Sequence, residues 1–322
     1  MIKDKANFGR IGVLMGGPSS EREVSLKSGK AVFNSLLESG VDAVAIDIST
    51  DDPQINTRLI NSYNIDCAFI ALHGFFGEDG RIQAILDRMN IPFTGSGELA
   101  SKLAIDKAAS RVILKVNGIN VPDCKVLGRL SYSPAWSRQI RLSFPLVVKP
   151  ASNGSSIGLT IVDAQDGLNK AIELAFGYDE KILIEDYIKG RELTVGVLGE
   201  QALPVIEIVP KNRYFDFQAK YTPGMTEYIV PARINDNIAE QLKSTALKVH
   251  KLLGCSGCSR VDMILGLDNS IYVLELNSIP GFTPTSLLPK AARAAGIDFK
   301  ELCLSLINMA YEKKQAELTA RG

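Results

Sequence analysis

The sequence predicts an α/β protein made of three consecutive units, and three observations favour this fold class. Short apolar, β-branched runs alternate with helical stretches over the first hundred residues or so. A glycine- and serine-rich loop follows a strand-like run at residues 151–158, and the pattern from residue 191 onward is rich in strands. A length of 322 residues also allows two or three domains of about 100–200 residues each.

Composition is that of an ordinary globular protein. Hydrophobic residues make up 46% of the chain and charged residues 22%, and 36 basic residues balance 36 acidic ones. There is no net charge to attract nucleic acid or an anionic membrane, so any phosphate binding must come from local groups. No apolar run is long enough to cross a bilayer and the first residues do not resemble a signal peptide, so we expect a cytoplasmic protein.

The first predicted unit, residues 1–105, has the alternation typical of βαβ units. Its expected elements are strands at 10–15, 43–48 and 67–72 and helices at 24–37 and 81–89. This order favours a parallel sheet with ligand-binding groups at the carboxyl ends of its strands. His73 follows the third strand there, and it is either a helper in substrate binding or a hydrogen-bonded core histidine.

The second predicted unit covers residues 106–190 and the third covers 191–322. Their expected helices are 107–117, 164–176 and 236–253, and their expected strands are 144–149, a strand near Thr160, 181–185, 193–198, 203–209, 261–265 and 271–276. Residues 210–231 contain few structure-forming signals. A loop of this length inside a compact protein is typical of a mobile functional element, so we interpret it as a lid.

The expected strands at 261–265 and 271–276 predict a hairpin with an acidic face. Asp268-Asn269 suits a two-residue turn, because both residue types tolerate positive φ. A turn centred there places Asp262 directly opposite Glu275, with Arg260 and Asn277 on the same face. Two opposed carboxylates are either splayed into solvent or share a cation, and two carboxylates with an amide oxygen suit magnesium.

Five segments, in order along the chain, resemble the motifs of D-alanine–D-alanine ligases, a family of the ATP-grasp superfamily. They are residues 16–26 (Gly-Gly-Pro-Ser-Ser-Glu-Arg-Glu-Val-Ser-Leu), 73–80 (His-Gly-Phe-Phe-Gly-Glu-Asp-Gly), 93–97 (Phe-Thr-Gly-Ser-Gly), 257–262 (Gly-Cys-Ser-Arg-Val-Asp) and 274–287 (Leu-Glu-Leu-Asn-Ser-Ile-Pro-Gly-Phe-Thr-Pro-Thr-Ser-Leu). The family more often has threonine at Ser278 and methionine at Phe282. The resemblance spans nearly the whole chain and implies an ATP-grasp fold with an N-terminal parallel-sheet domain.

The resemblance implies a nucleotide and metal site. In the family's pattern, Asp262, Glu275 and Asn277 hold two magnesium or manganese ions that bridge the phosphates of ATP. The other nucleotide contacts it implies are Lys107 and Lys149 at the phosphates, Glu185 and Ile188 at the adenine edge, and Glu192 at the ribose. The loop at residues 155–158 would close over the nucleotide.

The resemblance also implies a site for two D-alanines. Its residues are Glu21 at the ammonium group of the first, Ser286 and Leu287 at the carboxylate of the second, Arg260 at the developing oxyanion, Lys220 and Tyr221 on the lid, and His73 and Gly281 in the same substrate pocket. Tyr221 would join Glu21 and Ser155 in a hydrogen-bonded network. The implied reaction joins two D-alanines through an acyl phosphate, for peptidoglycan precursors, and the implied assembly is a homodimer.

Local chemistry offers plainer readings of some of these residues. Glu21 stands inside a capping-box pattern with Ser20 as the N-cap and Glu23 at N3, and Lys107 has the position of a solvated helix residue. The pair Cys255 and Cys258 lacks the further ligands of a zinc site. The five cysteines are odd in number and fit reduced thiols.

Two alternative functions remain open at this point. The first is a D-alanine–D-lactate or D-alanine–D-serine ligase, although Tyr221 on the lid favours the dipeptide. The second is a non-catalytic nucleotide-binding regulator with the same fold. The presence of Arg260 and Ser286 counts against a regulator, because a binding protein needs neither an oxyanion stabiliser nor a second substrate site.

Overall fold

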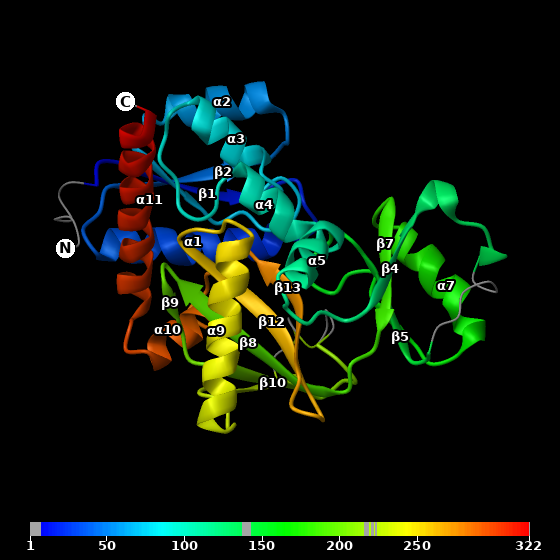
Figure 1. Ribbon diagram of the computed structural model, residues 1–322. Coiled ribbons are helices and arrows are strands. Elements are labelled where there is room, and N and C mark those ends of the chain that lie inside the picture. Colours follow the sequence, from blue (N-terminus) through cyan, green and yellow to red (C-terminus); the bar gives the residue numbers. More distant parts are fainter. Residues whose placement is uncertain (1–7, 137–142, 216–218, 220–221, 223, 322) are drawn as a thin grey trace.

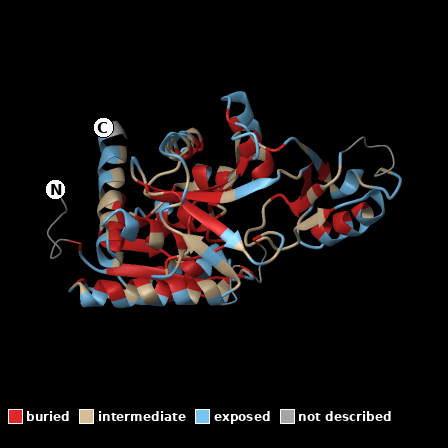
Figure 2. Cartoon of the chain, turned by 90° about the horizontal axis from the view of Figure 1, so that it is seen from below, coloured by how far each residue is buried: buried red, intermediate tan, exposed pale blue. Residues whose placement is uncertain are grey.

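Three β-sheets flanked by helices organise the chain in the computed structural model, which describes residues 8–136, 143–215, 219, 222 and 224–321 (Figure 1). The α/β fold class is confirmed. Buried residues are concentrated in the strands, whereas exposed residues follow the outer faces of the helices (Figure 2).

The first sheet is parallel, as predicted, and has the strand order β2-β1-β3. Its elements are β1 (Ile11–Gly16), α1 (Arg22–Glu38), β2 (Ala43–Ile48), α2 (Pro53–Ser62), β3 (Cys67–Ile70), α3 (Arg81–Arg88) and α4 (Glu98–Ile105). Every residue of β1 is buried, which explains its unbroken apolar run. Helices α2 and α4 were not predicted.

The second sheet is antiparallel, with the order β4-β7-β5-β6, and with α7 it forms the lobe at the right of Figure 1. Its elements are α5 (Lys107–Val116), β4 (Cys124–Gly128), a short 3-10 helix η2 (Arg129–Ser131), β5 (Leu146–Pro150), β6 (Thr160–Val162), α7 (Gln165–Phe176) and β7 (Lys181–Asp186). Asp106 caps α5 by accepting hydrogen bonds from the backbone N–H groups of Ala108 and Ala109, so Lys107 lies at the first position of that helix.

The third sheet is also antiparallel, in the order β11-β10-β8-β12-β13, with β9 beside β8. Its elements are β8 (Gly190–Leu198), β9 (Gln201–Ala202), β10 (Ile206–Pro210), β11 (Thr226–Ile229), α9 (Asp236–Leu252), β12 (Cys258–Gly266), β13 (Ile271–Asn277) and α10 (Leu287–Ala294). Strand β11 lies inside residues 210–231, which we had expected to lack regular structure. It pairs with β10, so part of the predicted lid belongs to the sheet.

The hydrophobic core does not divide at the predicted unit boundaries. Helix α11 (Phe299–Arg321) returns from the end of the chain to pack against α1 and β3. The rings of Phe69 and Phe282 also meet edge to face at 5.3 Å, so one cluster contains residues from both ends of the sequence. The boundaries at 105/106 and 190/191 therefore remain predictions.

The β12–β13 hairpin has the predicted pairing of Asp262 with Glu275, but a longer turn and a β-bulge together produce it. Gly266 N–H donates to the Ser270 carbonyl at 2.8 Å, which closes a three-residue loop in which Asn269 has a φ of 63°. This loop alone would set Asp262 opposite Leu274. A β-bulge between Asp262 and Met263 restores the pairing of Asp262 with Glu275, so the expectation that the turn alone fixes the register was wrong.

The start of α1 also differs from the sequence interpretation. The N-cap is Glu21, not Ser20, and no side chain caps the helix. Instead, the Ser19 hydroxyl accepts a hydrogen bond from the Glu21 backbone N–H at 3.1 Å and donates to the carbonyl of His73 at 2.7 Å. The capping box is therefore absent from this helix start, and the Glu21 carboxylate is left to face a pocket.

Two further observations concern the described part of the chain as a whole. None of its helices is both long and apolar enough to span a membrane. All five cysteines are free thiols, and burial raises the pKa of Cys255 to about 11.

We predict that His250 makes stability depend on pH. This α9 residue is 4% exposed and hydrogen-bonds Ser259, and burial, aided by Lys251, lowers its pKa from 6.5 to about 4. Between these values the unfolded chain binds a proton that the folded chain does not, so stability falls as the pH falls through this window. The His250 contribution should lower the free energy of unfolding by about 2 kcal/mol between pH 7 and pH 5.

Urea unfolding of the wild type and of His250→Gln at both pH values measures the contribution of His250 to the free energy of unfolding. The variant should lose less stability than the wild type between pH 7 and pH 5. Equal losses in the two proteins would refute the assignment.

Candidate active site

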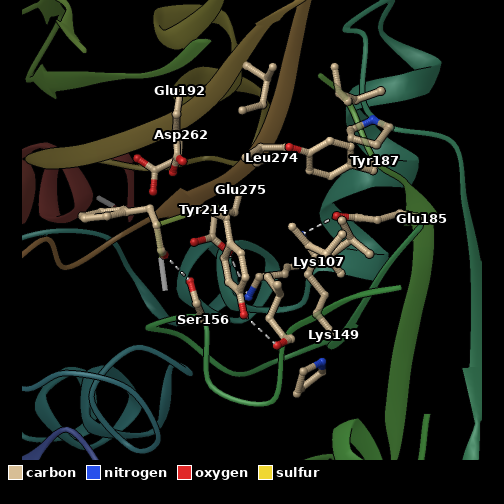
Figure 3. A pocket seen from close by; sticks show the side chains of 18 of the residues that line it. Lys107, Lys149, Ser156, Glu185, Tyr187, Glu192, Tyr214, Asp262, Leu274 and Glu275 are labelled. Carbon is tan, nitrogen blue, oxygen red and sulfur yellow. Dashed lines mark hydrogen bonds and ion pairs between the residues drawn. The ribbon is translucent and has the colours of Figure 1, made fainter. Parts of the chain in front are cut away.

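Two adjoining pockets lie where the three sheets meet, and they share the side chains of Lys107, Phe215 and Glu275. The first, the inter-sheet pocket, lies between the second sheet and the β12–β13 hairpin (Figure 3). The second, the α1 pocket, lies between the start of α1 and the loop at residues 278–286. The shared residues make the two pockets neighbours rather than separate cavities.

The inter-sheet pocket combines apolar walls with a few charged groups, as expected of a small-molecule site. Its apolar lining includes Val147, Ile157, Leu159, Ile161, Ile188, Ile264 and Leu274, and its charged lining includes Lys107, Lys149, Glu185, Glu192, Asp262 and Glu275. In Figure 3, Lys107 and Lys149 lie on the side of the pocket opposite Asp262 and Glu192. The apolar part fits a flat ring system, and the two lysines fit phosphate groups.

A buried charge cluster anchors the base of this pocket. Glu185 is 3% exposed, pairs with Lys149 at 2.8 Å and also contacts Arg111. Burial acts to raise the pKa of Glu185, but Lys149 and Arg111 together hold it below its ordinary range, whereas burial lowers the pKa of Lys149 despite that carboxylate. The Glu185 carboxylate is thus held by two cations, which fixes the Lys149 side chain at the pocket wall.

The acidic face of the hairpin lies where the two pockets join. Arg260 holds Asp262 with two hydrogen bonds of 2.9 and 2.8 Å, and Thr194 donates a third to the same carboxylate at 2.6 Å. Glu275 pairs with Lys107 at 3.2 Å. Lys107 is only 6% exposed, and its ammonium group also donates to the Asn153 carbonyl at 2.8 Å, so it is not the solvated helix residue that local pattern suggested.

The bulge explains why two consecutive residues of β13 line the inter-sheet pocket. In a regular strand the side chains of Leu274 and Glu275 would point to opposite faces of the sheet. Because the bulge adds one residue at this point, Val273 and Leu276 enter the core while Leu274 and Glu275 both line the pocket. Arg111 donates to the Leu274 carbonyl at 3.2 Å and so holds the bulged residue.

The oxygen donors on this face fit a hard divalent cation. Asp262 and Glu275 are directly paired, and Asn277 pairs with Arg260 one step further along the same face. The amide oxygen of Asn277 accepts a hydrogen bond from Ile279 at 3.0 Å and retains a second lone pair. Among the described residues no three His, Cys, Asp or Glu side chains group as a metal site, so a cation here would need the amide as well as both carboxylates.

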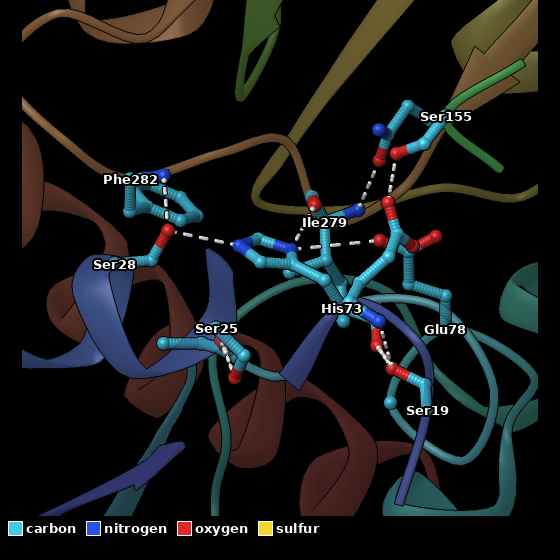
Figure 4. A network of polar contacts seen from close by, with 12 residues as sticks. Ser19, Ser25, Ser28, His73, Glu78, Ser155, Ile279 and Phe282 are labelled. Atoms are coloured by element: carbon cyan, nitrogen blue, oxygen red, sulfur yellow. Dashed lines mark hydrogen bonds and ion pairs between the residues drawn. The ribbon is translucent and has the colours of Figure 1, made fainter. Parts of the chain in front are cut away.

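The α1 pocket brings two acidic side chains and a histidine together (Figure 4). Glu21 is 9% exposed and accepts a hydrogen bond from the Ser155 hydroxyl. His73 lies 3.6 Å from Glu78, whose pKa is raised by burial even though His73 acts in the opposite direction. A ligand ammonium group is the natural partner for the Glu21 carboxylate in this setting.

The opposite wall of the α1 pocket is the start of α10. Ser286 is the N-cap of α10, and its side chain makes no capping hydrogen bond to the helix. Its hydroxyl instead accepts from the Thr283 backbone N–H at 3.1 Å, while Gly281 leaves room beside it. Uncapped N–H groups at a helix start suit a carboxylate, so this wall complements an amino acid held by Glu21.

Residues 210–215 are tied to the glycine- and serine-rich loop and the strand that follows it. The Ser156 hydroxyl donates to the Phe215 carbonyl at 2.9 Å. Arg213 makes two hydrogen bonds of 2.6 Å to Asp163, one to each carboxylate oxygen. We call these contacts the latch, because they hold two segments together; Ser156 and Phe215 line the inter-sheet pocket.

Every predicted site residue within the described part of the chain lines one of the two pockets. The inter-sheet pocket contains Lys107, Lys149, Glu185, Ile188, Glu192, Asp262 and Glu275, and the α1 pocket contains Glu21, His73, Ser155, Arg260, Asn277, Gly281, Ser286 and Leu287 together with the shared Lys107 and Glu275. Lys220 and Tyr221 lie outside the described residues.

Several residues of the site were not predicted. Glu78 and Arg111 are buried beside predicted residues, and Phe215 and Tyr228 line the α1 pocket. Glu78 falls within the quoted motif at 73–80, which was a usable signal. Arg111 lies one helical turn after Lys107, and that spacing was the only hint of its position.

Comparison with known proteins places the chain in a family. The model of the D-ala D-ala ligase C-terminus matches residues 113–308, and that of the N-terminus matches residues 52–96. The D-alanine–D-alanine ligase of Geotalea uraniireducens is 47% identical over 302 residues, which cover 94% of this chain and 96% of the relative.

Solved structures agree with these sequence matches. The Bacillus anthracis D-alanine–D-alanine ligase complexed with ATP superposes with a TM-score of 0.82 at 35% identity, over 96% of this chain and 99% of that one. The VanG D-Ala:D-Ser ligase of Enterococcus faecalis gives a TM-score of 0.80 at 31% identity, over 94% and 99%. The chain belongs to the D-alanine–D-alanine ligase family.

Proposed function

We propose that this protein joins two D-alanines into D-alanyl-D-alanine at the expense of ATP, for the synthesis of peptidoglycan precursors. The observation that carries the proposal is the meeting of the two pockets at Lys107 and Glu275. A nucleotide in the inter-sheet pocket and an amino acid in the α1 pocket would place a phosphate next to a carboxylate. The ligases that the chain resembles carry the same activity in their names.

In the first step, a carboxylate oxygen of the first D-alanine attacks the γ-phosphorus of ATP and ADP leaves. Glu21 binds the ammonium group of this D-alanine, which leaves its carboxylate directed toward the shared residues. Lys107 and Lys149 bind the phosphates, and the charge cluster around Glu185 keeps Lys149 in place. Fixed cations at the point where negative charge develops are an effective form of catalysis.

In the second step, the amine of the second D-alanine attacks the acyl carbon, phosphate leaves with one former carboxylate oxygen, and the new amide nitrogen loses a proton. Ser286 and the start of α10 bind the carboxylate of this second substrate. Arg260 stabilises the oxyanion that forms on the acyl carbon. The contacts of Arg260 with Asp262 hold its guanidinium group at the junction of the pockets.

The proposal includes magnesium, or manganese, as a companion of ATP. Asp262, Glu275 and Asn277 would hold it, and their oxygen donors fit such a cation. When bound, it would neutralise phosphate charge and orient the phosphate groups.

The latch supports a further part of the proposal. An acyl phosphate is readily hydrolysed, so the intermediate needs protection from water. The contact of Ser156 with Phe215 holds the loop at 151–158 against residues 210–215, and the contact of Arg213 with Asp163 holds the end of β6 against the same residues. The part of residues 210–231 that lies outside β11 would complete this cover.

The D-alanine–D-alanine product is favoured over the alternatives. Relatives that are 47% and 43% identical over 94% of this chain are both named D-alanine–D-alanine ligases. Arg260 and Ser286 both line the α1 pocket, and a non-catalytic regulator would need neither residue. The proposal also places the reaction in the cytoplasm, where ATP is available, and the assembly as a homodimer, which light scattering on the purified protein tests.

We predict that the purified protein, with ATP and magnesium at neutral pH, releases phosphate in step with dipeptide when D-alanine is the only amino acid. D-lactate and D-serine, offered as second substrates, should give much less product. Coupled phosphate release and mass spectrometry of the products measure both. Product with D-lactate alone would reject the dipeptide activity, and no release with any acceptor would reject the enzyme.

We predict that Asp262→Asn and Glu275→Gln each lower magnesium-dependent turnover by about 100-fold or more, because each removes a charge from the cation site. Asp268→Asn is the matched control, since it makes the same change at the exposed tip of the same hairpin. Steady-state turnover at saturating ATP is the measurement, with circular dichroism to verify folding. Unchanged turnover in both site variants would refute the metal assignment.

We predict that opening the latch uncouples ATP hydrolysis from ligation. Arg213→Gln and Asp163→Asn each remove an exposed ion pair, so the ratio of phosphate released to dipeptide formed should rise by about two- to fivefold. Lys243→Gln, which removes another exposed pair on α9, is the control. A ratio that stays at the wild-type value in both latch variants would show that these contacts do not protect the intermediate.

A further inference from the structure

Ser28 has no role in the site described so far, yet it contacts two segments that form it. It lies on α1, seven residues after Glu21, and is fully buried. Its hydroxyl oxygen is 2.9 Å from Nε2 of His73 and 3.2 Å from the backbone nitrogen of Phe282 (Figure 4). The Ser28 hydroxyl therefore contacts both His73, in the wall of the α1 pocket that contains Glu21, and the loop at 278–286.

The partners of this network fix the direction of its hydrogen bonds. The Phe282 N–H can only donate, so the Ser28 oxygen accepts there. The Ile279 carbonyl can only accept, so Nδ1 of His73, which is 3.1 Å away, carries a proton. A neutral imidazole then has a bare Nε2, and the Ser28 hydroxyl donates its proton to that nitrogen.

A doubly protonated His73 would be incompatible with this order of hydrogen-bond donors and acceptors. Nε2 would then donate to Ser28, and the Ser28 proton would need another acceptor at a site with no exposure. Among the described residues the hydrogen bonds of Ser28 go only to His73 and Phe282.

The same contacts connect the two walls of the α1 pocket. His73 and Glu21 belong to one wall, and the Ser19 hydroxyl joins their backbones. Ile279 and Phe282 flank Gly281 on the loop that leads to Ser286. Ser28 lies at the centre, so its hydroxyl links the binding site of the ammonium group to that of the second carboxylate.

We propose that Ser28 is a positioning residue for the D-alanine pocket, because its hydroxyl holds neutral His73 through Nε2 and binds the loop at 278–286 through Phe282. The kinetic part of this inference rests on the proposed function, whereas the protonation of His73 does not. The plainer possibility is that Ser28 only satisfies buried polar groups of the fold, as Ser25 does between Gly16 and Ala71.

Nitrogen-15 NMR of the ligand-free protein tests the direction of the hydrogen bonds. The chain has only two histidines, so a His250→Gln variant assigns both rings. At neutral pH, His73 should show a protonated Nδ1 and an unprotonated Nε2 whose signal reports a hydrogen bond. In Ser28→Ala the Nε2 signal should move toward that of a nitrogen without a donor.

Kinetics of the same variant test the positioning role. In Ser28→Ala the KM for D-alanine should rise by about three- to tenfold, the range expected for one lost hydrogen bond, while the KM for ATP stays unchanged. Ser28→Thr, which keeps the hydroxyl, should recover most of the loss, and Ser28→Cys serves if the alanine variant does not fold. Ser35→Ala is the matched control, because Ser35 is buried two turns along the same helix and its side chain neighbours Cys303 rather than the α1 pocket.

Two results would overturn the proposal. One is a wild-type His73 that carries its proton on Nε2 or on both nitrogens. The other is a Ser28→Ala protein, or the cysteine variant in its place, whose KM for D-alanine changes no more than that of Ser35→Ala. If the wild type has no ligase activity, the proposed function fails while the NMR result still decides the role of Ser28 toward His73.

Discussion

The rest of the site depends on how the protein accommodates two opposed carboxylates on one face of a hairpin. Asp262 and Glu275 are paired across β12 and β13, where like charges repel. Each is stabilised by its own cation, Arg260 or Lys107. These two cations come from different parts of the chain, so neutralising the pair also brings the start of α5 against the third sheet and creates the junction of the two pockets.

Around this junction, buried polar contacts link segments that are distant in sequence. Arg111 connects Glu185 of the second sheet with the bulged Leu274 of the third. Ser28 and His73 connect the first unit with the loop that precedes α10. Each of these groups would be costly to bury alone, so the contacts hold the three sheets in one arrangement. Chemistry that requires two substrates to meet depends on such fixed geometry.

The sequence predicted the strands of the parallel sheet and the face shared by Asp262 and Glu275. Through the family resemblance it also predicted some, but not all, of the residues that line the two pockets. It could not predict the bulge at Leu274, because the three-residue turn and the extra residue compensate and leave the alternation almost unchanged. The burial of Lys107 depends on Asn153 and Glu275, which are distant in sequence. The roles of Arg111 and Ser28 likewise depend on tertiary contacts that no local pattern records.

The most direct test of the account follows one oxygen atom. If the two pockets meet as described, a carboxylate oxygen of the first D-alanine attacks the γ-phosphorus of ATP and leaves with the phosphate. D-alanine labelled with oxygen-18 in its carboxylate should therefore give phosphate that contains one labelled oxygen for each dipeptide formed, as measured by phosphorus-31 NMR. Phosphate without the label, released together with dipeptide, would contradict the account.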